Sequence, residues 1–379
     1  QATQPMRIRR KKMNNSPEIM TEEQVYETVT LEEAADSLDK AENTLILTHV
    51  NPDGDCIGSA FALRDIILAL GKDASVANPS VMPKRLKFLS CQTGEDCPED
   101  GDVPHMSETD EESLSRFDRI ISVDVASPIQ LDKNAFLIPQ ISLMIDHHGM
   151  GEPFAKNYID PCASAAGEIV YEMYAYLKSI GKLSSVPDAA RKMYAAIVSD
   201  TGSFKFSNTT KKTHLIAAEL LEEINSANDG GMDTSDVCRS LFGQRTLKEL
   251  TAQMLAIQNL RFYNDGKLGA VLFTQDMLEE AGLTENDIGN VVDTPRGVEG
   301  VLVGISLRQL SEDRRLYKVS SRANAEIDCA AVCAAHGGGG HVRAAGCTIE
   351  ADSPEEALDM MTKAFGEAVE KYAAEKEAR

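Results

Sequence analysis

Residues 141–148 read Ile-Ser-Leu-Met-Ile-Asp-His-His, a short apolar run that ends in polar side chains. Such a run, bounded by polar residues, is typical of a buried β-strand. Similar runs alternate with helical patterns along the chain: strands at 44–48, 74–77 and 117–123, and helices at 31–41, 56–70, 163–180, 188–198 and 210–224. Short apolar strands between helices indicate a mostly parallel sheet with helices on both faces. We therefore predict an α/β fold with a larger N-terminal lobe of this kind.

The C-terminal part predicts a second, smaller α/β lobe. Its expected strands and helices are strands at 268–273, 301–307, 316–321 and 347–349, and helices at 328–335 and from 353 onward. A chain of 379 residues exceeds the usual size of one hydrophobic core, which agrees with two lobes. The predicted domains are a disordered leader at 1–28, a first domain at 29–225, linker helices at 226–262 and a second domain at 263–379.

The overall charge limits the kinds of partner. Lysine and arginine number 38 against 60 acidic residues, which gives a formal net charge of −22. A protein that coats long duplex nucleic acid normally carries a basic stripe, so the acidic body disfavours that class. Anions must then be bound by a local site. The basic cluster at residues 7–12 of the leader is interpreted as a solvated tail, with a nucleic-acid arm as the alternative.

Composition also bears on the compartment. No stretch of the sequence approaches the roughly 20 apolar residues needed to cross a membrane. Residues 1–20 lack the apolar core of a secretory signal. The eight cysteines do not follow the pattern of a small disulfide scaffold, which is typical of free thiols in a reducing compartment. We expect a cytoplasmic protein without a membrane partner.

Histidines and aspartates follow the ends of the predicted strands. His49 follows the first strand and opens a loop, residues 49–55, that reads His-Val-Asn-Pro-Asp-Gly-Asp. Asp124 follows the strand at 117–123, and Asp146 follows the apolar run at 141–145. In parallel α/β sheets, ligands bind outside the carboxyl ends of the strands. These positions therefore predict one shared site.

The residue types in these segments suit divalent metal ions. Asp53 and Asp55 are separated by one residue and can each reach a different ion. Asp124 is free to bridge both ions, and Asp200 ends another apolar segment and can complete the second. The imidazole of His147 suits Mn²⁺, Fe²⁺ or Zn²⁺ better than Mg²⁺. We therefore expect two Mn²⁺ as cofactors, with Mg²⁺, Co²⁺ or Fe²⁺ as substitutes.

Such a pair of ions predicts phosphoester hydrolysis. Two ions about 3.5–4 Å apart clamp the attacking and leaving oxygens of an in-line displacement and generate hydroxide at neutral pH. A hydroxide bridging the ions beside Asp124 would be the nucleophile. His148 would hydrogen-bond the scissile phosphate or protonate the leaving oxygen. Asp124 and His148 are the expected catalytic residues of a metal-dependent phosphoesterase.

Other readings of these motifs are weaker. A lone Asp-x-Asp in a Pro/Gly loop is usually a turn, but its combination with three further segments at strand ends disfavours that reading. Residues 200–202 read Asp-Thr-Gly, yet an aspartic protease needs two such carboxylates and the chain has no second copy. A zinc site from Cys329, Cys333, His336 and His341 is disfavoured, because cysteines in an alanine-rich helix are usually core residues.

A glycine run at 337–340 precedes His341 and Arg343. Consecutive backbone N–H groups can cradle an anion, although the run lacks the Lys-Ser/Thr of a P-loop. Arg322, after a predicted strand, is a further phosphate ligand candidate, because its guanidinium is bidentate and always charged. The alternative for the glycines is close helix packing without a ligand.

Together these segments resemble the DHH/DHHA1 phosphoesterases. The loop at 49–55, Asp124, Asp146-His147-His148, Asp200 and the glycine-rich stretch 337–346 carry the resemblance, which runs from about residue 29 to about 366. Within that family the chain is most similar to the stand-alone bifunctional oligoribonuclease (nanoRNase)/pAp phosphatases and the related cyclic-di-AMP and pApA phosphodiesterases. The first predicted domain is then the DHH catalytic domain, and the second is the DHHA1 substrate-binding domain.

The resemblance implies roles for individual residues. His49 and Asp53 would hold one Mn²⁺, and Asp124 would bridge to the other. The second ion would be held by Asp55, His147 and Asp200. His148 would touch the substrate phosphate, and the far nucleotide would be gripped in the second lobe by Gly338, Gly339, Gly340, His341, Arg322 and Arg343. The active site would lie in the cleft between the lobes, and the protein would be a homodimer.

The expected function is exoribonuclease-like hydrolysis of short oligoribonucleotides (nanoRNA, pApA) to mononucleotides and of pAp to AMP. A cyclic-di-AMP phosphodiesterase is the alternative. A family II inorganic pyrophosphatase is disfavoured by the glycine-rich segment before His341, and an inactive nucleotide-binding regulator is disfavoured by the complete set of candidate ligands.

Overall fold

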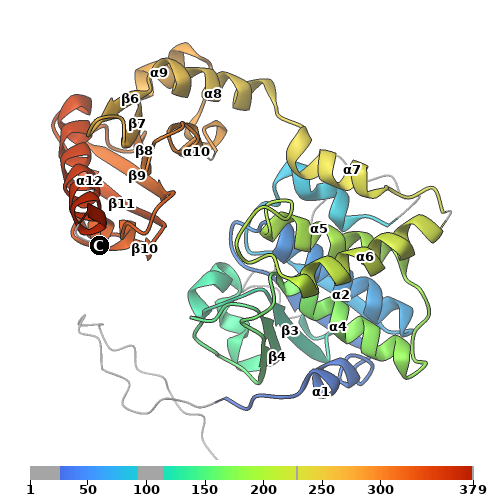
Figure 1. Cartoon of the computed structure of the whole chain (residues 1–379). Coiled ribbons are helices and arrows are strands. Elements are labelled where there is room, and N and C mark those ends of the chain that lie inside the picture. Colours follow the sequence, from blue (N-terminus) through green and yellow to red (C-terminus); the bar gives the residue numbers. More distant parts are fainter. Residues whose placement is uncertain (1–25, 93–113, 228, 290, 378–379) are drawn as a thin grey trace, which may run out of the picture. The chain divides into compact units, whose positions relative to one another are not determined.

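The computed structural model describes residues 26–92, 114–227, 229–289 and 291–377. Residues 1–25 of the expected leader therefore lie outside the described residues. The chain divides into two compact units, Gln1–Gln244 and Arg245–Arg379 (Figure 1). The segment expected to hold linker helices is divided between these units, because α7 (Thr234–Cys238) belongs to the first and α8 (Leu247–Gln258) to the second.

The first unit contains a parallel five-stranded sheet with the order β2-β1-β3-β4-β5. Its strands are β1 (Asn43–Leu47), β2 (Asp73–Ala77), β3 (Arg119–Val123), β4 (Ile141–Asp146) and β5 (Asn157–Ile159). All neighbouring strands pair in parallel. The predicted parallel α/β lobe is thus confirmed. The strand β5 was not predicted, because three residues are too few to show a period.

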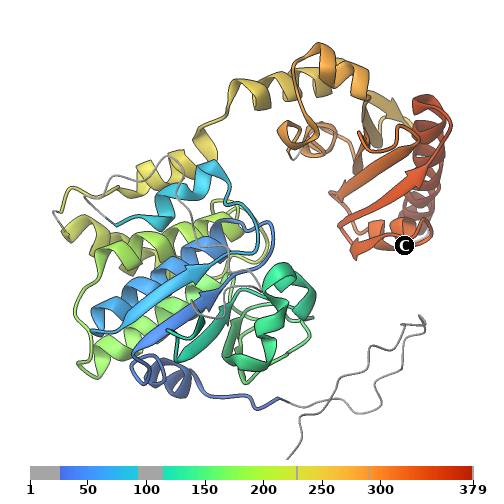
Figure 2. The same ribbon diagram turned by 180° about the vertical axis from the view of Figure 1, so that it is seen from behind.

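The two faces of this sheet are covered differently. One face packs against a layer of α-helices: α1 (Leu31–Asp36), α2 (Gly54–Ala69), α4 (Ala166–Ser179), α5 (Pro187–Asp200) and α6 (Lys211–Ser226). The other face packs against the 3-10 segment η2 (Pro128–Gln140), whose Leu131 and Leu137 are buried against Leu45 and Met144. Figures 1 and 2 show η2 and the α-helices on opposite sides of the sheet. The second cover is therefore 3-10 rather than α-helical.

Close helix packing in the first unit depends on small residues. A Cβ on Gly58 of α2 would lie 2.7 Å from the carbonyl oxygen of Lys192 in α5. A Cβ on Gly167 of α4 would lie 2.6 Å from the Cβ of Ala196 in α5. Because the helix backbones approach this closely, the start of α2, the start of α4 and the end of α5 come together. Two shorter elements, η1 (Lys84–Ser90) and the π-helical η3 (Arg239–Gly243), also pack in this unit.

The second unit contains a mixed six-stranded sheet with the order β10-β11-β9-β8-β7-β6. The strands are β6 (Arg261–Tyr263), β7 (Leu268–Phe273), β8 (Val303–Gln309), β9 (Leu316–Ala323), β10 (Gly339–His341) and β11 (Ala344–Glu350). Only β7 and β8 pair in parallel. The helical elements are α8, α9 (Gln275–Glu280), η4 (Glu285–Asp287), α10 (Asp293–Arg296), α11 (Cys329–Ala334) and α12 (Pro354–Glu377).

The side chains of β9 alternate between the two faces of the second sheet. Tyr317, Val319 and Ser321 of β9 are buried, and the first two belong to the core beneath α11 and α12. The residues between them point to the other face, which α8 covers at β7 and α10 covers at Gly269 of β7 and Gly304 of β8. That face carries Lys318, Ser320 and Arg322 of β9 and Gly346 and Thr348 of β11, all exposed or half-buried. We call this surface the bare sheet face.

Two further predictions can be compared with the structure. Among the described residues, no helix is both long and apolar enough to span a membrane. Six cysteines are free thiols, at 56, 162, 238, 329, 333 and 347, whereas Cys91 is disulfide-bonded. The expectation of free thiols is therefore wrong at Cys91. Disulfide pairing requires Cα atoms within about 7 Å of each other, and spacing in the sequence does not reveal that distance.

Candidate metal centre

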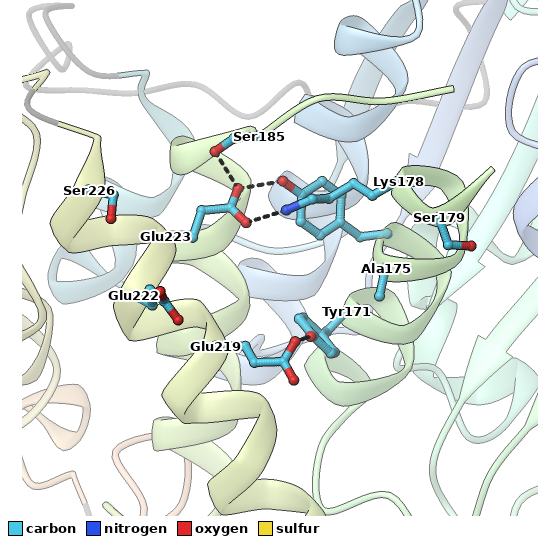
Figure 3. Close-up of a pocket in the computed structure, with 10 residues that line it drawn as sticks. Tyr171, Ala175, Lys178, Ser179, Ser185, Glu219, Glu222, Glu223 and Ser226 are labelled. Carbon is cyan, nitrogen blue, oxygen red and sulfur yellow. Dashed lines mark hydrogen bonds and ion pairs between the residues drawn. The ribbon is translucent and has the colours of Figure 1, made fainter. Parts of the chain in front are cut away.

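Two of the places in the first unit where polar side chains gather are candidate sites. One is a hollow of about 780 Å³ between α4 and α6 (Figure 3). Two of its three carboxylates are already partnered: Glu223 accepts hydrogen bonds from the Tyr174 hydroxyl, from Ser185 at 2.8 Å and from Lys178 at 2.8 Å. Glu219 accepts from the Tyr171 hydroxyl. These contacts tie α4, α6 and the start of α5 together, which is a structural role.

The other place is the carboxyl end of the sheet. His49 comes two residues after β1, Asp124 directly follows β3, and Asp146 is the last residue of β4. Because β1, β3 and β4 are parallel neighbours, these residues reach the same edge. The side chains that meet there are His49, Asp53, Asp55, Asp124, Asp146, His147, His148 and Asp200, and we call them the carboxylate–imidazole cluster.

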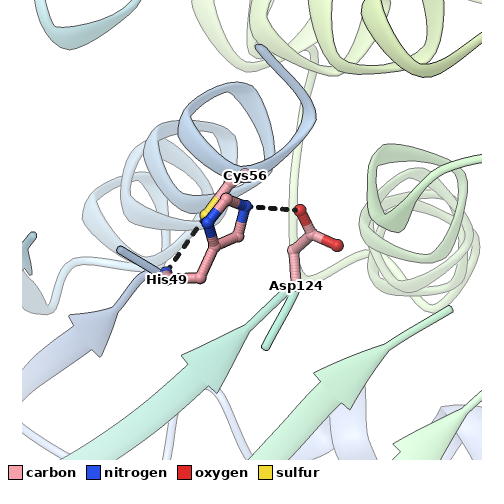
Figure 4. A group of neighbouring side chains, drawn as sticks. All are labelled: His49, Cys56 and Asp124. Carbon is pink, nitrogen blue, oxygen red and sulfur yellow. Dashed lines mark hydrogen bonds and ion pairs between the residues drawn. The ribbon is translucent and has the colours of Figure 1, made fainter. Parts of the chain in front are cut away.

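One side of the cluster is built around His49 (Figure 4). Its Nε2 lies 3.6 Å from Asp124 Oδ2 and 4.0 Å from Asp53 Oδ1. Its Nδ1 lies 2.9 Å from the Val50 carbonyl oxygen, which leaves Nε2 facing the carboxylates. The Asp53 carboxylate also caps α2, since Oδ1 accepts from the backbone N–H groups of Asp55 and Cys56, both at 3.0 Å. Asp53 is therefore both a helix cap and a candidate ligand.

Cys56 is a member of this neighbourhood that sequence reasoning missed. Its sulfur accepts a hydrogen bond from the backbone N–H of His49 at 3.4 Å, and it lies close to Asp124 as well (Figure 4). Burial raises the pKa of the Cys56 thiol to about 12. A neutral thiol that holds the His49 backbone is consistent with these facts. Its place in the first turn of α2 was the only available signal.

The other side of the cluster is built around His147. Its Nε2 lies 3.6 Å from Asp55 Oδ2, 3.6 Å from Asp124 Oδ1 and 3.8 Å from Asp200 Oδ2. Its Nδ1 lies 3.3 Å from the Ala163 carbonyl oxygen, so Nε2 again faces the carboxylates. Asp124 thus presents one oxygen toward His49 and the other toward His147. This is the position required of a group that bridges two ions.

Asp55 is held firmly by neighbouring donors. Its Oδ1 accepts from Ser59 Oγ at 2.9 Å and from the Gly167 N–H at 3.0 Å, and its Oδ2 accepts from the Ala166 N–H at 2.7 Å. The last two donors open helix α4, whose N-terminus favours a negative charge. The orientation of Asp55 is therefore fixed by two helices.

His148 faces the cluster from its exposed side. Its Nδ1 lies 2.8 Å from Asp146 Oδ1 and 3.6 Å from Asp124 Oδ1, and its side chain is 43% exposed. The hydrogen bond to Asp146 raises the pKa of His148 to about 9. Asp146, named by sequence as a strand-end candidate, is fully buried and orients both histidines, because its Oδ1 also accepts from the His147 N–H at 2.8 Å.

The electrostatics of the cluster indicate a shortage of positive charge. Burial raises the pKa of Asp55 well above its usual value, and the carboxylates of Asp124 and Asp200 raise it further. Burial likewise raises the pKa of Asp200 to about 6. Burial acts in the same direction on Asp124, but its histidine neighbours, His49 first, lower the pKa of that carboxyl overall. Crowded buried carboxylates of this kind are stabilised by a nearby cation.

The contacts fit a metal site on geometric grounds as well. The separations of 3.6–4.0 Å between imidazole nitrogens and carboxylate oxygens are too long for hydrogen bonds. Two ligand atoms at about 2.1 Å from one ion would be on the order of 3–4 Å apart. The buried Asp124 Oδ1 has no hydrogen-bond partner among the described residues. Asp124 also adopts a φ of 57°, a strained backbone conformation that recurs at functional sites.

The remaining candidate residues lie in the second unit. Arg322 is half-buried on the bare sheet face, and its Nη1 donates to the Ser321 carbonyl oxygen at 2.9 Å. His341 is exposed on β10, and Arg343 lies 3.4 Å from the Glu326 carboxylate. Cys329 and Cys333 are buried in the core, as expected for structural cysteines. The ligand groups that come together in the described ranges do not include these cysteines.

The glycine run serves two different purposes. A Cβ on Gly338 would collide with the backbone of β11 at Gly346, and one on Gly340 would lie 2.6 Å from the Ala344 carbonyl oxygen. These two glycines are explained by close packing of the run against the strand β11, whereas the alternative raised from the sequence was packing against a helix. A Cβ on Gly339 would meet no atom within 4 Å. Packing among the described residues therefore does not account for Gly339.

Known proteins give the following matches. Residues 43–197 match the DHH family, N-terminal domain, and residues 268–371 match the DHHA1 domain. The chain is 30% identical over 328 residues to the bifunctional oligoribonuclease and PAP phosphatase NrnA of Thermus thermophilus, covering 85% of this chain and 89% of that protein. It is 28% identical over 313 residues to the protein of the same name from Bacillus subtilis, covering 81% of this chain and 90% of that protein.

Among solved structures, an exopolyphosphatase-related protein from Bacteroides fragilis has a similar fold. The TM-score is 0.75 and the sequence identity is 23%, with 90% of this chain and 96% of that chain covered. At this identity the match concerns the fold alone.

Proposed function

The chain belongs to the DHH family of metal-dependent phosphoesterases, as its motifs predict, and on that premise we propose that it hydrolyses short oligoribonucleotides to mononucleotides and pAp to AMP. The observation that carries the proposal is the placement of Asp124, whose two oxygens face two separate imidazole–carboxylate groups at 3.6 Å. Its similarity to proteins named as oligoribonucleases and PAP phosphatases supports the choice of substrate.

Two divalent ions, with Mn²⁺ as the first choice, would be held by the cluster. His49, Asp53 and Asp124 would bind one ion. The other would be bound by Asp124, Asp55, His147 and Asp200. When bound, such ions supply Lewis acidity at the phosphate and lower the pKa of water. The firm attachment of Asp55 to α2 and α4 would keep the ligand set in place during turnover.

His148 would act directly on the substrate phosphate. Because Asp146 occupies its Nδ1, the ring is oriented and Nε2 is the nitrogen left for a phosphate oxygen. A raised pKa favours the protonated ring, which donates a charge-assisted hydrogen bond to a negative oxygen. The same proton can be transferred to the leaving oxygen.

The second unit would recognise the rest of the nucleotide. Arg322, His341 and Arg343 would supply positive charge or N–H donors, and Gly339 would let a nucleotide approach the backbone of the run that also contains Gly338 and Gly340. The formal charge of −22 would disfavour long polymers, because repulsion grows with the number of phosphates.

A substrate panel tests this function. The purified full chain with Mn²⁺ is assayed on pAp, pApA, a linear trinucleotide, cyclic di-AMP and pyrophosphate. We expect mononucleotides from pApA and the trinucleotide, and AMP with orthophosphate from pAp. A clear preference for cyclic di-AMP would instead assign the alternative phosphodiesterase function. Release of orthophosphate from pyrophosphate alone would reject the proposal.

A further inference from the structure

A small polar pocket opens on the second sheet and includes two residues of the bare sheet face. Its volume is about 160 Å³, and its polar lining consists of Ser306 and Arg308 of β8 and Lys318 and Ser320 of β9. These four residues are cross-strand neighbours, since Ser306 pairs with Ser320 and Arg308 pairs with Lys318. Phe273 of β7 forms part of the apolar wall. The pocket lies entirely within the second unit.

The polar groups of this pocket are largely free to bind a ligand. Among the described residues, no hydrogen bond or ion pair engages the Lys318 ammonium or the hydroxyls of Ser306 and Ser320. Arg308 is partly engaged: its Nη1 donates to the Glu285 carbonyl oxygen at 2.8 Å, and its Nε lies 3.8 Å from the Glu285 carboxylate. That Nε is buried and lacks a hydrogen-bond partner in the described part of the chain.

This donor set is selective for an anion. It offers two cations and two hydroxyls, against one nearby carboxylate that is already shared with the N–H of Ser311 and the amide of Gln275. Lysine and arginine with hydroxyl donors are the usual ligands of phosphate. A pocket of about 160 Å³ is smaller than a site for a whole nucleotide, which typically requires about 300 Å³ or more. It suits a single phosphate group.

We propose that Ser306, Arg308, Lys318 and Ser320 form a subsite for a backbone phosphate of an oligonucleotide, separate from the phosphate that is cleaved. This inference rests on the proposed function, because it concerns the same substrate. Lys318 and Arg322 lie four residues apart on one face of β9, or about 13 Å at the rise of a β-strand. Two cations separated by this distance can bind different phosphates of one oligonucleotide. A mononucleotide bound at Arg322 leaves the pocket empty.

The subsite therefore acts as a sensor of substrate length. The variant Lys318→Gln removes its free cation while keeping a long polar side chain in an exposed position. We expect KM for a linear trinucleotide to rise about tenfold, the effect of one charge-assisted hydrogen bond. KM for pAp and kcat for both substrates stay unchanged. The matched control is Lys363→Gln, which removes another exposed lysine from α12, the helix that covers the opposite face of the sheet.

A binding measurement separates this inference from the proposed function. Metal-free protein is titrated with a fluorescent trinucleotide at several salt concentrations. Each phosphate contact in a single strand contributes about 0.7 to the slope of log K against log salt, so Lys318→Gln should lower that slope by about 0.7. An unchanged slope, or an equal loss for pAp and the trinucleotide, overturns the subsite. Failure of the wild-type chain to cleave any nucleotide overturns the proposed function, while the titration still tests the subsite.

Discussion

The carboxylate–imidazole cluster of the first unit contains buried carboxylates, whereas the bare sheet face of the second unit carries cationic side chains that are exposed or half-buried. In the cluster, Asp55 and Asp124 are buried, and Asp55 is held by three donors. On the sheet face, Lys318 is exposed and Arg322 is half-buried, and among the described residues Lys318 has no partner. Buried carboxylates that repel one another are stabilised by a bound cation, whereas exposed cationic side chains are available to bind an anion. The first arrangement suits chemistry at a fixed point, and the second suits recognition of a variable chain.

Removal of divalent ions should give the largest difference between the two regions, because it should abolish hydrolysis at the cluster and leave binding at the sheet face. With a chelator present, we expect hydrolysis of all substrates to fall to background and to return when Mn²⁺ is added. The thermal midpoint of the first unit should also fall, because bound ions stabilise by about 2.7 kcal/mol at a hundredfold excess over Kd. Calorimetry measures that shift. Binding of the trinucleotide to the second unit should persist, and its complete loss would contradict the division of roles.

Asp124→Asn tests the bridging position within the cluster. Because each oxygen of Asp124 faces a different imidazole, the amide can serve at most one side. We expect kcat to fall by more than about 10²-fold, because even the outer-shell partners of metal ligands typically cost about 10–100-fold when replaced. Steady-state kinetics on pAp provide the measurement.

The control for Asp124→Asn is Asp359→Asn on α12, an exposed carboxylate remote in sequence from the cluster. It should leave kcat unchanged. Circular dichroism should give the same secondary structure for both variants. Full activity of Asp124→Asn would refute the assignment of the cluster as the catalytic centre.

The cluster could be anticipated from the sequence much better than the sheet face. His49, Asp124 and Asp146 all follow apolar runs, and the carboxyl ends of parallel strands meet at one edge. The orienting role of Asp146 and the cap made by Asp53 were not predicted, because the sequence does not show which way these side chains turn, although their partners lie only two or three residues away. Lys318 gave no signal, since an exposed lysine on a strand resembles any solvated residue.

Short elements and close contacts were the other features that the sequence did not reveal. The strand β10 contains only three residues, which are too few to show a period in the sequence. Its pairing with β11, which starts at Gly339↔Gly346, is seen in the structure. The 3-10 segment η2 lacks the period of an α-helix and includes Pro139. Contacts at Gly58 join α2 to α5, which are remote in sequence, so no local pattern marks them.

Gly58→Ala tests whether the cluster depends on close helix packing. The added Cβ would lie 2.7 Å from the Lys192 carbonyl oxygen, which is rigid backbone. We expect the free energy of unfolding to fall by about 1–3 kcal/mol, as for other overpacked sites. Denaturant unfolding measures the change. Asp55 lies on α2 and Asp200 lies on α5, so the added Cβ should also displace these two candidate ligands. The activity per amount of folded protein should therefore fall. Unchanged stability would show that α2 and α5 can separate without cost.

Gly339→Ala gives the smallest expected effect and is the matching test in the second unit. Its Cβ would meet no atom within 4 Å, so the unfolding free energy should change by less than about 0.5 kcal/mol, as for surface substitutions. If a nucleotide approaches the backbone here, KM should rise by a few-fold while kcat stays constant. Gly338→Ala, whose Cβ collides with β11, should instead destabilise the unit. A stable Gly339→Ala protein with unchanged KM would show that the nucleotide does not approach the backbone at Gly339. Recognition by the second unit would then depend on side chains alone, through Arg322 and the basic residues near it.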